Sequence, residues 1–401
     1  MQKRFPEGIS VNILLLGVVS FLTDASSEMI LPIFPMFITV LGGTGIAVGL
    51  IGGLGDSIAS LLKVWTGYLS DKLGRRKPFV FYGYLTSSIA KLFFPLSTIW
   101  QHLLISRSVE RIGKGLRTAP RDAIIADYAP KEIRGKGFGI HRALDTGGAI
   151  VGSVAALLLV LLFKLSATSE LWIFKKILIV AAIVAFVALI PLYFVREKVR
   201  AGIRLDFKLG FRGLSKDFKM FTGIATLFSL GNFSYMFFIL MARDTFLKSF
   251  ALKQATAIAI LLYIIYNIFY ALFSIPTGIL SDKIGRRRTL IIGYSLFGVA
   301  CLGFAYSKSL VWFIILFTIY GLFYAFADGT QRAFASDLSS EEKYGTGLGF
   351  FHTATGLAML PASLIAGALW QYMSKESVFM YGAALAFLAV LLLVVSMKKY
   401  K

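Results

Sequence analysis

Long apolar segments recur along the whole chain, and they constrain its fold more than any other feature of the sequence. Each runs for about 20 residues or more, the length that an α-helix needs to cross roughly 30 Å of hydrocarbon. They are too long for the strands of a membrane barrel and lack the alternation that such strands require. We therefore predict an all-α integral membrane protein with twelve transmembrane helices, at residues 11–40, 47–69, 78–99, 103–127, 137–163, 171–194, 219–242, 254–280, 289–307, 310–335, 345–372 and 377–397.

The composition supports a membrane protein. Of the 401 residues, 57% are hydrophobic and 16% are charged, and a soluble domain cannot bury so much apolar surface. The net charge of +21 would suggest a nucleic-acid partner in a soluble protein. Here the basic residues gather in short polar segments between apolar ones, as the positive-inside rule expects. The predicted partner is therefore the lipid bilayer, with no nucleic acid.

The basic segments also predict the orientation. They are 71–77, 131–137, 195–218, 282–288 and the tail that ends at Lys401. All of them fall on one side if the N-terminus is inside, so we expect a multi-pass cell-membrane protein with both termini in the cytoplasm. The segment MQKRFPEGIS leads directly into an apolar stretch too long for a signal peptide, and we expect no cleavable signal.

The two halves of the chain repeat each other. GYLSDKLGRRK begins at Gly67 and GILSDKIGRRR at Gly278, an offset of 278 − 67 = 211 residues. The same offset places Arg121 on Arg332. Such a repeat predicts two pseudo-symmetric six-helix bundles, at 1–194 and 219–401, joined by a basic linker at 195–218.

The repeated segment resembles the loop signature of the major facilitator superfamily, in which a glycine precedes an aspartate and clustered arginines. The resemblance covers essentially the full length and implies two helical domains around a central cavity that opens alternately to each side. Asp71 precedes Arg75 by four residues, a spacing that permits a local ion pair. Gly67 permits close helix contact. The resemblance implies a gating role for Gly67, Asp71, Arg75, Arg76, Gly278, Asp282 and Arg286.

Two further segments resemble signatures of transporters within this superfamily. RSVERIGKG (107–115) is similar to the fourth-span signature of proton-coupled antiporters, with Arg107 on its arginine. In the fifth span, Gly148 and Gly152 match an exporter signature, but Ser153 stands where that signature has proline. TDASSEM and GKGLRTAPRDA together resemble a little-characterised archaeal and bacterial branch, which implies no particular substrate.

The fourth span carries its charges on one face, roughly 140° wide at helical periodicity. Charged groups that face lipid cost several kcal/mol, so this face should contact protein or a water-filled pathway. Basic residues slightly outnumber acidic ones inside the spans, which favours an anionic or zwitterionic organic substrate; mutual neutralisation is the alternative. The candidate substrate and cavity residues are Asp24, Glu28, Arg107, Glu110, Arg111, Lys114, Arg117, Arg121, Asp328, Gln331 and Arg332.

Coupling to an ion needs a group that changes its charge. The candidates for proton coupling are Asp24, Glu28 and Glu110, while sodium coupling and uncoupled movement stay open. The repeat offset aligns Arg117 with Asp328, and we hypothesise that the two pair or jointly bind a charged substrate. Aromatic and amide side chains that could line the second half of the cavity are Tyr235, Tyr263, Tyr266, Asn267, Tyr270 and Tyr324.

No enzyme signature competes with this interpretation. The Gly-Lys-Gly at 113–115 lacks the spacing of a phosphate-binding loop, and no nucleophile elbow is present. A single cysteine, Cys301, and three widely separated histidines predict neither a metal site nor a cofactor. We predict a monomeric secondary transporter of a small organic solute that is coupled to H⁺. The alternatives are a multidrug or hydrophobic-compound efflux antiporter and an uncoupled facilitator.

Overall fold

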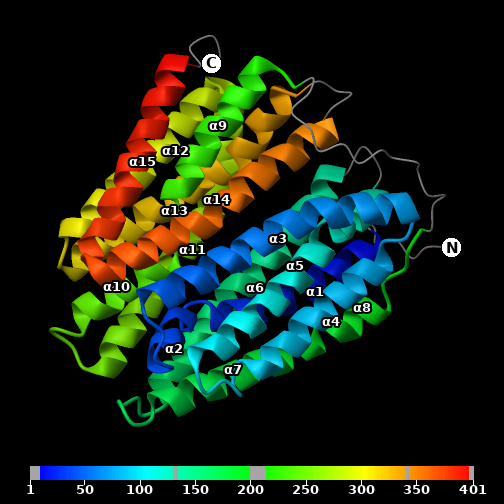
Figure 1. Cartoon of the computed structure of the whole chain (residues 1–401). Coiled ribbons are helices and arrows are strands. Elements are labelled where there is room, and N and C mark those ends of the chain that lie inside the picture. Colours follow the sequence, from blue (N-terminus) through cyan, green and yellow to red (C-terminus); the bar gives the residue numbers. More distant parts are fainter. Residues whose placement is uncertain (1–9, 130–133, 199–213, 340–343, 397–401) are drawn as a thin grey trace. The chain divides into compact units, whose positions relative to one another are not determined.

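A computed structural model describes residues 10–129, 134–198, 214–339 and 344–396, and α-helices account for most of them (Figure 1). The helices are α1 (Val11–Ile30), α2 (Phe34–Val40), α3 (Gly45–Leu73), α4 (Lys77–Phe93), α5 (Trp100–Tyr128), α6 (Arg134–Leu162), α7 (Glu170–Val187), α8 (Leu189–Tyr193), α9 (Lys216–Gly231), α10 (Met236–Phe246), α11 (Leu252–Ile284), α12 (Arg286–Tyr306), α13 (Leu310–Asp337), α14 (Tyr344–Tyr372) and α15 (Lys375–Ser396).

These helices form the twelve predicted spans because three of the spans are interrupted. The first is α1 and α2, which flank Pro32; the sixth is α7 and α8; the seventh is α9 and α10. Within the described ranges, ten spans are long and apolar enough to cross a membrane by length and composition. The other two are α4, with 17 residues, and α5, which is too polar. The prediction of twelve spans, which included both of these segments, is confirmed.

Contacts divide the chain into two units. The first comprises Met1–Gly42 and Ile58–Phe207, and the second comprises Gly43–Ser57 and Lys208–Lys401. The helix α3 is therefore divided between the units: its residues up to Ser57 belong to the second unit and its residues from Ile58 belong to the first. The predicted linker at 195–218 lies mostly outside the described residues, although α9 already begins within it. The predicted bundle boundaries stay a prediction.

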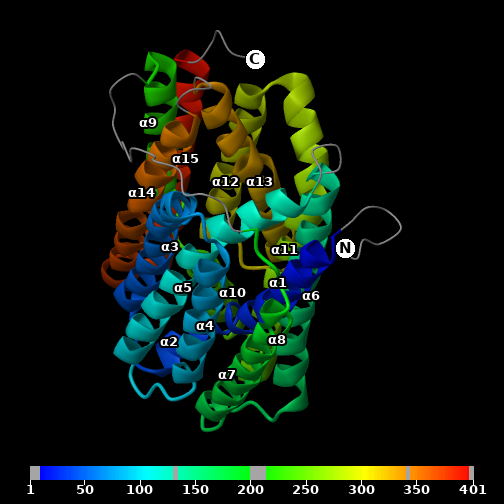
Figure 2. The same ribbon diagram turned by 90° about the vertical axis from the view of Figure 1, so that its right-hand side faces the viewer.

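Small residues bring the helices of the first unit into backbone contact. α1 and α6 lie side by side (Figure 2), and a Cβ atom on Gly152 would lie 2.1 Å from the carbonyl oxygen of Ala25. On α4, a Cβ on Gly83 would lie 2.8 Å from the carbonyl oxygen of Gly113 in α5. Such small residues replace the side-chain packing that drives helix association in water, because lipid is as apolar as the helices are.

Aromatic rings fill much of the second unit. Phe228 of α9 stacks on Tyr294 of α12 with ring centroids 3.7 Å apart, and Phe238 of α10 stacks on Tyr320 of α13 at 4.2 Å. The first half of α3 belongs to this unit because Ser57 donates a 2.7 Å hydrogen bond to the carbonyl oxygen of Gly356 in α14.

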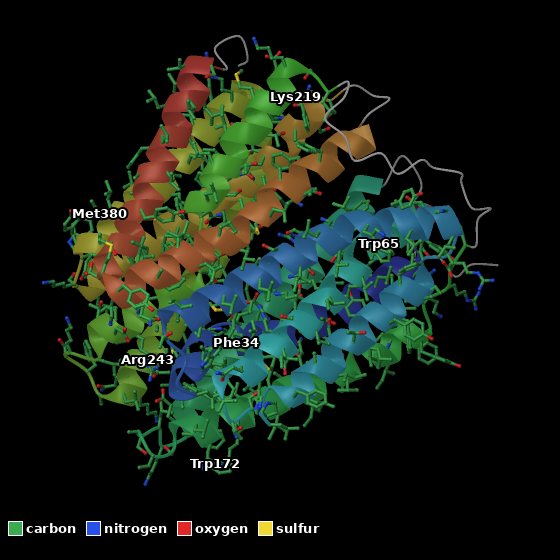
Figure 3. All side chains as sticks on the ribbon, in the orientation of Figure 1. Phe34, Trp65, Trp172, Lys219, Arg243 and Met380 are labelled. Atoms are coloured by element: carbon green, nitrogen blue, oxygen red, sulfur yellow. The ribbon has the colours of Figure 1, made fainter. Side chains whose placement is uncertain are left out.

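The outward faces of the helices are apolar. Trp65, Trp172 and Met380 are all exposed, whereas Phe34 is fully buried (Figure 3). Large exposed apolar side chains of this kind suit contact with lipid, where no hydrophobic penalty applies. Several charged side chains of the spans, such as Arg107, Glu110 and Arg117, are buried instead.

Candidate functional site

The charges of α5 form a buried ion cluster inside the first unit. The Arg107 guanidinium donates to the Glu110 carboxylate at 2.9 Å, and the Nε of Arg111 lies 3.6 Å from the same carboxylate. The Arg107 guanidinium also lies over the ring of Phe34 in α2, 5.2 Å from its centre. Arg107 and Glu110 are 4% and 2% exposed, so the cluster is sealed from bulk water.

Lys91 of α4 is a further buried cation that the sequence analysis did not assign to a site. It is 1% exposed, and its ammonium group donates to the hydroxyls of Ser26 at 2.8 Å and Ser27 at 2.9 Å, both on α1. The available signal was a lysine within a short apolar helix, since an intramembrane charge is costly unless it has a role.

Arg117 points into the helix pair α4–α5. It donates to the hydroxyl of Ser87, and its guanidinium lies 4.4 Å from the ring centre of Tyr84. Of the predicted charged face, Lys114 is exposed while Arg107, Glu110 and Arg117 are buried. The face is therefore largely packed against protein, because an α5 in backbone contact with α4 carries its neighbouring side chains into the same interface.

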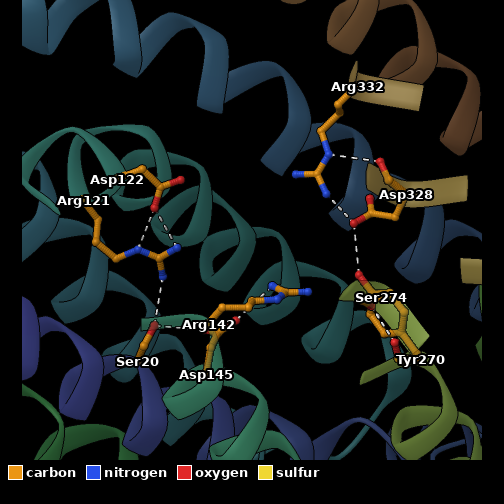
Figure 4. Close-up of polar contacts among 9 residues, drawn as sticks. All are labelled: Ser20, Arg121, Asp122, Arg142, Asp145, Tyr270, Ser274, Asp328 and Arg332. Carbon is orange, nitrogen blue, oxygen red and sulfur yellow. Dashed lines mark hydrogen bonds and ion pairs between the residues drawn. The ribbon is translucent and has the colours of Figure 1, made fainter. Parts of the chain in front are cut away.

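A second polar network joins α1, α5 and α6 (Figure 4). Ser20 donates to Asp145 at 2.9 Å and accepts from Arg121 at 3.0 Å. Arg142 donates to the other oxygen of Asp145 at 3.1 Å. The side chain of Asp24 lies within hydrogen-bonding reach of Asp145. The network brings Asp24 and Arg121 together, as two of the predicted site residues, and adds Asp145 to them.

The other predicted acid of the first span, Glu28, lies one helical turn beyond Asp24. Its carboxylate accepts a long 3.5 Å hydrogen bond from Ser153 of α6. Ser153 is the residue that stands in place of the exporter proline, so the departure from that signature supplies a hydroxyl donor. Arg121, for its part, pairs with the neighbouring Asp122 at 3.0 Å.

The predicted site residues of the second unit gather on α13. Asp328 pairs with Arg332 one turn later and accepts a 3.0 Å hydrogen bond from the hydroxyl of Tyr270 in α11. Gln331 lies half-buried beside them. Arg117 and Asp328 each have contacts within their own unit, and the pairing of the two stays a prediction.

The predicted tyrosines of the second unit do come together. Tyr266 lies next to Tyr263, Tyr270 and Tyr324, with ring centres 5.6, 6.4 and 5.5 Å away, and Tyr235 lies 5.7 Å from Tyr263. Tyr270 links this ring cluster to the carboxylate of Asp328. The second unit therefore contains an aromatic cluster, in which Tyr263 and Tyr266 are buried, with one ion pair at its edge.

The loop between α3 and α4 is organised around Arg76. Its guanidinium pairs with Asp71 at 2.9 Å and with Asp127 at the end of α5, and its backbone N–H donates to Glu197. Burial alone would lower the pKa of Arg76, but the carboxylates of Asp71 and Asp127 raise it above its usual value. The expected Asp71–Arg75 pair is wrong: Arg75 is exposed, and its neighbour makes the ion pair.

In the repeated loop between α11 and α12, the ion pair forms between an aspartate and an arginine four residues later, as the sequence predicted for the first loop. Arg286 pairs with Asp282 at 2.6 Å and with Asp337, at the end of α13, at 3.2 Å. The acids at the ends of α5 and α13 were missed, although their spacing of 337 − 127 = 210 residues nearly matches the repeat offset. The two loops thus share one arrangement, in which an arginine bridges its own loop aspartate and the end of another helix.

The glycines of the two loop signatures differ in their roles. Gly74 and Gly285 have φ of 65° and 95°, conformations that other residues rarely adopt, and they end α3 and α11. A Cβ atom on Gly67 would lie 3.3 Å from Ala119 in α5, which agrees with the predicted close contact. A Cβ on Gly278 would meet no atom within 4 Å, so close packing does not explain that glycine.

Replacing Arg76 with alanine is expected to lower the unfolding free energy of the purified protein by about 2 kcal/mol, because the nearly buried carboxylate of Asp127 and the more exposed one of Asp71 lose a charged donor. The exposed neighbour supplies a matched control, and Arg75→Ala should change stability by less than about 0.5 kcal/mol. Thermal unfolding in detergent measures both variants. Equal effects of the two substitutions would contradict the role of Arg76 as the centre of the loop.

No cluster of three or more metal-ligating side chains occurs among the residues that the structure describes. Cys301 is a buried free thiol in α12. Neither observation supplies a site for chemistry, and the polar groups described above are the candidates for function.

Comparison with known proteins gives a consistent result over the whole chain. A model of the Major Facilitator Superfamily matches residues 16–262 and 245–400. An uncharacterized MFS-type transporter of Methanocaldococcus jannaschii is 52% identical over 386 residues, which cover 96% of this chain and 94% of that protein. The quinolone resistance protein NorA of Staphylococcus aureus is 26% identical over 132 residues, 33% of this chain and 34% of its own length.

Solved structures share the fold at low sequence identity. The nucleoside transporter NupG superposes with a TM-score of 0.75 at 16% identity, covering 98% of this chain and 100% of its own. A POT family transporter, solved with a thioalcohol-conjugated peptide, gives a TM-score of 0.75 at 13% identity, covering 98% of this chain and 99% of its own.

Proposed function

The chain belongs to the major facilitator superfamily, and from that premise we propose that it is a secondary transporter of a small organic anion or zwitterion. The solute crosses the cell membrane by alternating access, with protons as the coupling ion. The protein acts as a monomer without enzymatic activity. The observation that carries the choice of substrate is an excess of positive charge among the charged side chains of α1, α4, α5 and α6, two of which, Lys114 and Arg142, are exposed.

The excess is visible in the two polar networks of α1, α4, α5 and α6. Together they contain seven basic and five acidic side chains, which are Lys91, Arg107, Arg111, Lys114, Arg117, Arg121 and Arg142 against Asp24, Glu28, Glu110, Asp122 and Asp145. The two exposed cations, Lys114 and Arg142, make this excess accessible, and an accessible positive charge attracts an anion. A negatively charged group on the solute would balance the charge and gain affinity from doing so.

The exposed ammonium group of Lys114 is the best candidate for first contact with the solute. It lies on the same helix as the sealed Arg107–Glu110 pair, but it is accessible where that pair is not. The tyrosine cluster of the second unit would contact the apolar part of the solute. We propose that Lys114, Arg121 and Tyr270 are binding residues and that the Arg107–Glu110 pair holds α5 in place.

The gating proposal rests on the two Arg-centred loops. Arg76 and Arg286 each bridge a loop aspartate and an acid at the end of another helix, although the repeat offset of 211 residues places Arg286 on Arg75. A charge bridge of this kind stabilises one of two helix arrangements. With the basic segments inside, both loops and both termini face the cytoplasm, and the bridges act on that side.

Two alternatives have specific support. Efflux of hydrophobic compounds is favoured by the partial similarity to NorA and by the exporter glycines Gly148 and Gly152, but the match covers a third of the chain and Ser153 replaces the proline. An uncoupled facilitator is favoured if the charges of the first unit neutralise one another.

Counterflow in proteoliposomes tests the proposal. Vesicles that contain the purified full-length protein and an unlabelled solute should accumulate labelled organic anions at least tenfold faster than labelled organic cations of similar size. The Lys114→Gln variant should lose most of that preference, because it removes an accessible positive charge. An imposed pH gradient separates coupled transport from facilitation. A preference of the wild-type protein for cations would exclude the anion proposal.

A further inference from the structure

We propose that Asp24 of α1 and Asp145 of α6 hold a single shared proton and form the proton-binding site of this protein, an inference that rests on the proposed proton-coupled transport. The two residues are 121 positions apart in the sequence (145 − 24), and their side chains lie within hydrogen-bonding reach of each other. Asp145 was not among the proton-coupling candidates that the sequence suggested.

The proton follows from hydrogen-bond chemistry. An ionised carboxylate only accepts hydrogen bonds, so two carboxyl groups in hydrogen-bond contact need a proton between them. Two ionised carboxylates at that distance repel each other strongly in a medium of low dielectric constant. The pair therefore holds one proton when the two groups are together and releases it when they separate or when a cation comes closer.

The backbone holds the two acids together. A Cβ atom on Gly148 would lie 2.2 Å from the carbonyl oxygen of Phe21, and one on Gly152 would lie 2.1 Å from that of Ala25. Asp24 lies between Phe21 and Ala25 in sequence. The close contact of α1 with α6 thus surrounds Asp24, and the distance between the two carboxyl groups is set by helix packing rather than by flexible side chains.

Cations on three helices lie near the pair and would balance its negative charge when the proton leaves. Arg142 of α6 donates a hydrogen bond to one carboxylate oxygen of Asp145. Ser20 of α1 donates to the other oxygen and accepts a hydrogen bond from Arg121 of α5. Lys114 of α5 and Lys91 of α4 interact electrostatically with Asp24. The further titratable and charged neighbours are His141 and Asp122. A modest shift of α5 or of Arg142 would change which charge balances the pair.

The pair also satisfies a requirement that Glu110 does not. A coupling proton must reach its site from water, and the side chain of Asp145 is 17% exposed. The carboxylate of Glu110 is 3% exposed and receives two guanidinium groups, at 2.9 and 3.6 Å. Opposite charges at such distances favour the ionised form of Glu110 at all times. Glu110 is thereby assigned to structure and the Asp24–Asp145 pair to proton binding.

Infrared difference spectroscopy of the purified full-length protein tests this assignment without a known substrate. The spectrum recorded between acidic and alkaline pH should contain the C=O stretch of a buried protonated carboxyl group. Asp24→Asn and Asp145→Asn should each remove the same band, because a single proton belongs to both residues, and the asparagine amide can donate to the remaining carboxylate. Persistence of the band in either variant would overturn the proposal.

Control variants separate the pair from other carboxyl groups. Glu28→Gln, one helical turn along α1, should keep the band, as should Asp244→Asn, whose carboxylate pairs with Lys375 in the second unit. Asp24→Glu retains a carboxyl group and should keep a shifted band, which covers the case that an asparagine variant fails to fold. Loss of the band in Glu28→Gln instead would assign the proton to that residue and contradict the shared pair.

Transport measurements distinguish this inference from the proposed function. If proton-driven uptake occurs and survives in Asp24→Asn with its band intact, the proton site is wrong while the transport proposal stands. If the band behaves as expected but no imposed pH gradient drives any solute, the proton pair stands and proton-coupled transport is wrong.

Discussion

Substitution of Glu110 by glutamine is expected to lower the unfolding free energy by about 3–5 kcal/mol, the largest effect of any single charge in the chain. The carboxylate of Glu110 lies between the guanidinium groups of Arg107 and Arg111 and is sealed from water. Glutamine keeps the shape of the side chain but leaves two positive charges without their anion. Thermal or denaturant unfolding of the purified protein in detergent measures the loss.

Two comparisons make the result specific. The double variant Glu110→Gln, Arg107→Gln should recover part of the stability, because it removes one of the uncompensated charges. Asp244→Asn breaks the ion pair with Lys375, whose side chain is 42% exposed, and should cost less than about 1 kcal/mol. If Glu110→Gln were no worse than Asp244→Asn, the buried cluster would not hold α5 in place.

Substitution of Gly152 by alanine is expected to have the second-largest effect, a loss of about 1–3 kcal/mol together with loss of proton binding at Asp24. The added methyl group would lie 2.1 Å from the carbonyl oxygen of Ala25, and backbone on both sides prevents a local adjustment. The helices α1 and α6 must separate, and the two carboxyl groups would separate with them. Unfolding and the infrared band report the two effects independently.

Gly139, on the same helix, provides the matched control. A Cβ atom there would meet no atom within 4 Å, so alanine should be neutral or slightly stabilising through its higher helix propensity. A stable Gly152→Ala variant with an unchanged carboxyl band would show that the close contact of α1 with α6 is not needed for either property.

The fold could be predicted from the sequence because a bilayer leaves few alternatives. Apolar runs of sufficient length gave the twelve spans, and the repeat at Gly67 and Gly278 gave the two-fold organisation. The helix breaks within three of the spans were not predicted. They depend on local features such as Pro32, which interrupts a helix whose hydropathy continues across it.

The site was predicted only in part, because helical periodicity specifies a face but not the neighbour that the face meets. It made Asp24 and Arg121 candidates but could not show that Asp145 would reach Asp24 from α6. The same limit explains the wrong pairing in the first loop: a spacing of four residues suits Asp71 and Arg75 in a continuous helix, but the helix ends at Leu73. Beyond that end the chain turns at Gly74, and Arg76 rather than Arg75 pairs with Asp71.

The polarity of α5 has a consequence for how the chain enters the membrane during synthesis. Each charged side chain at the centre of an isolated span opposes insertion by roughly 2.5–3.5 kcal/mol, so α5 by itself would not partition into lipid. Its partners on α4, Tyr84 and Ser87, are made before it, whereas Asp145 is made after it. We therefore expect α4 to stay at the translocon until α5 arrives, so that the two helices enter lipid as a pair.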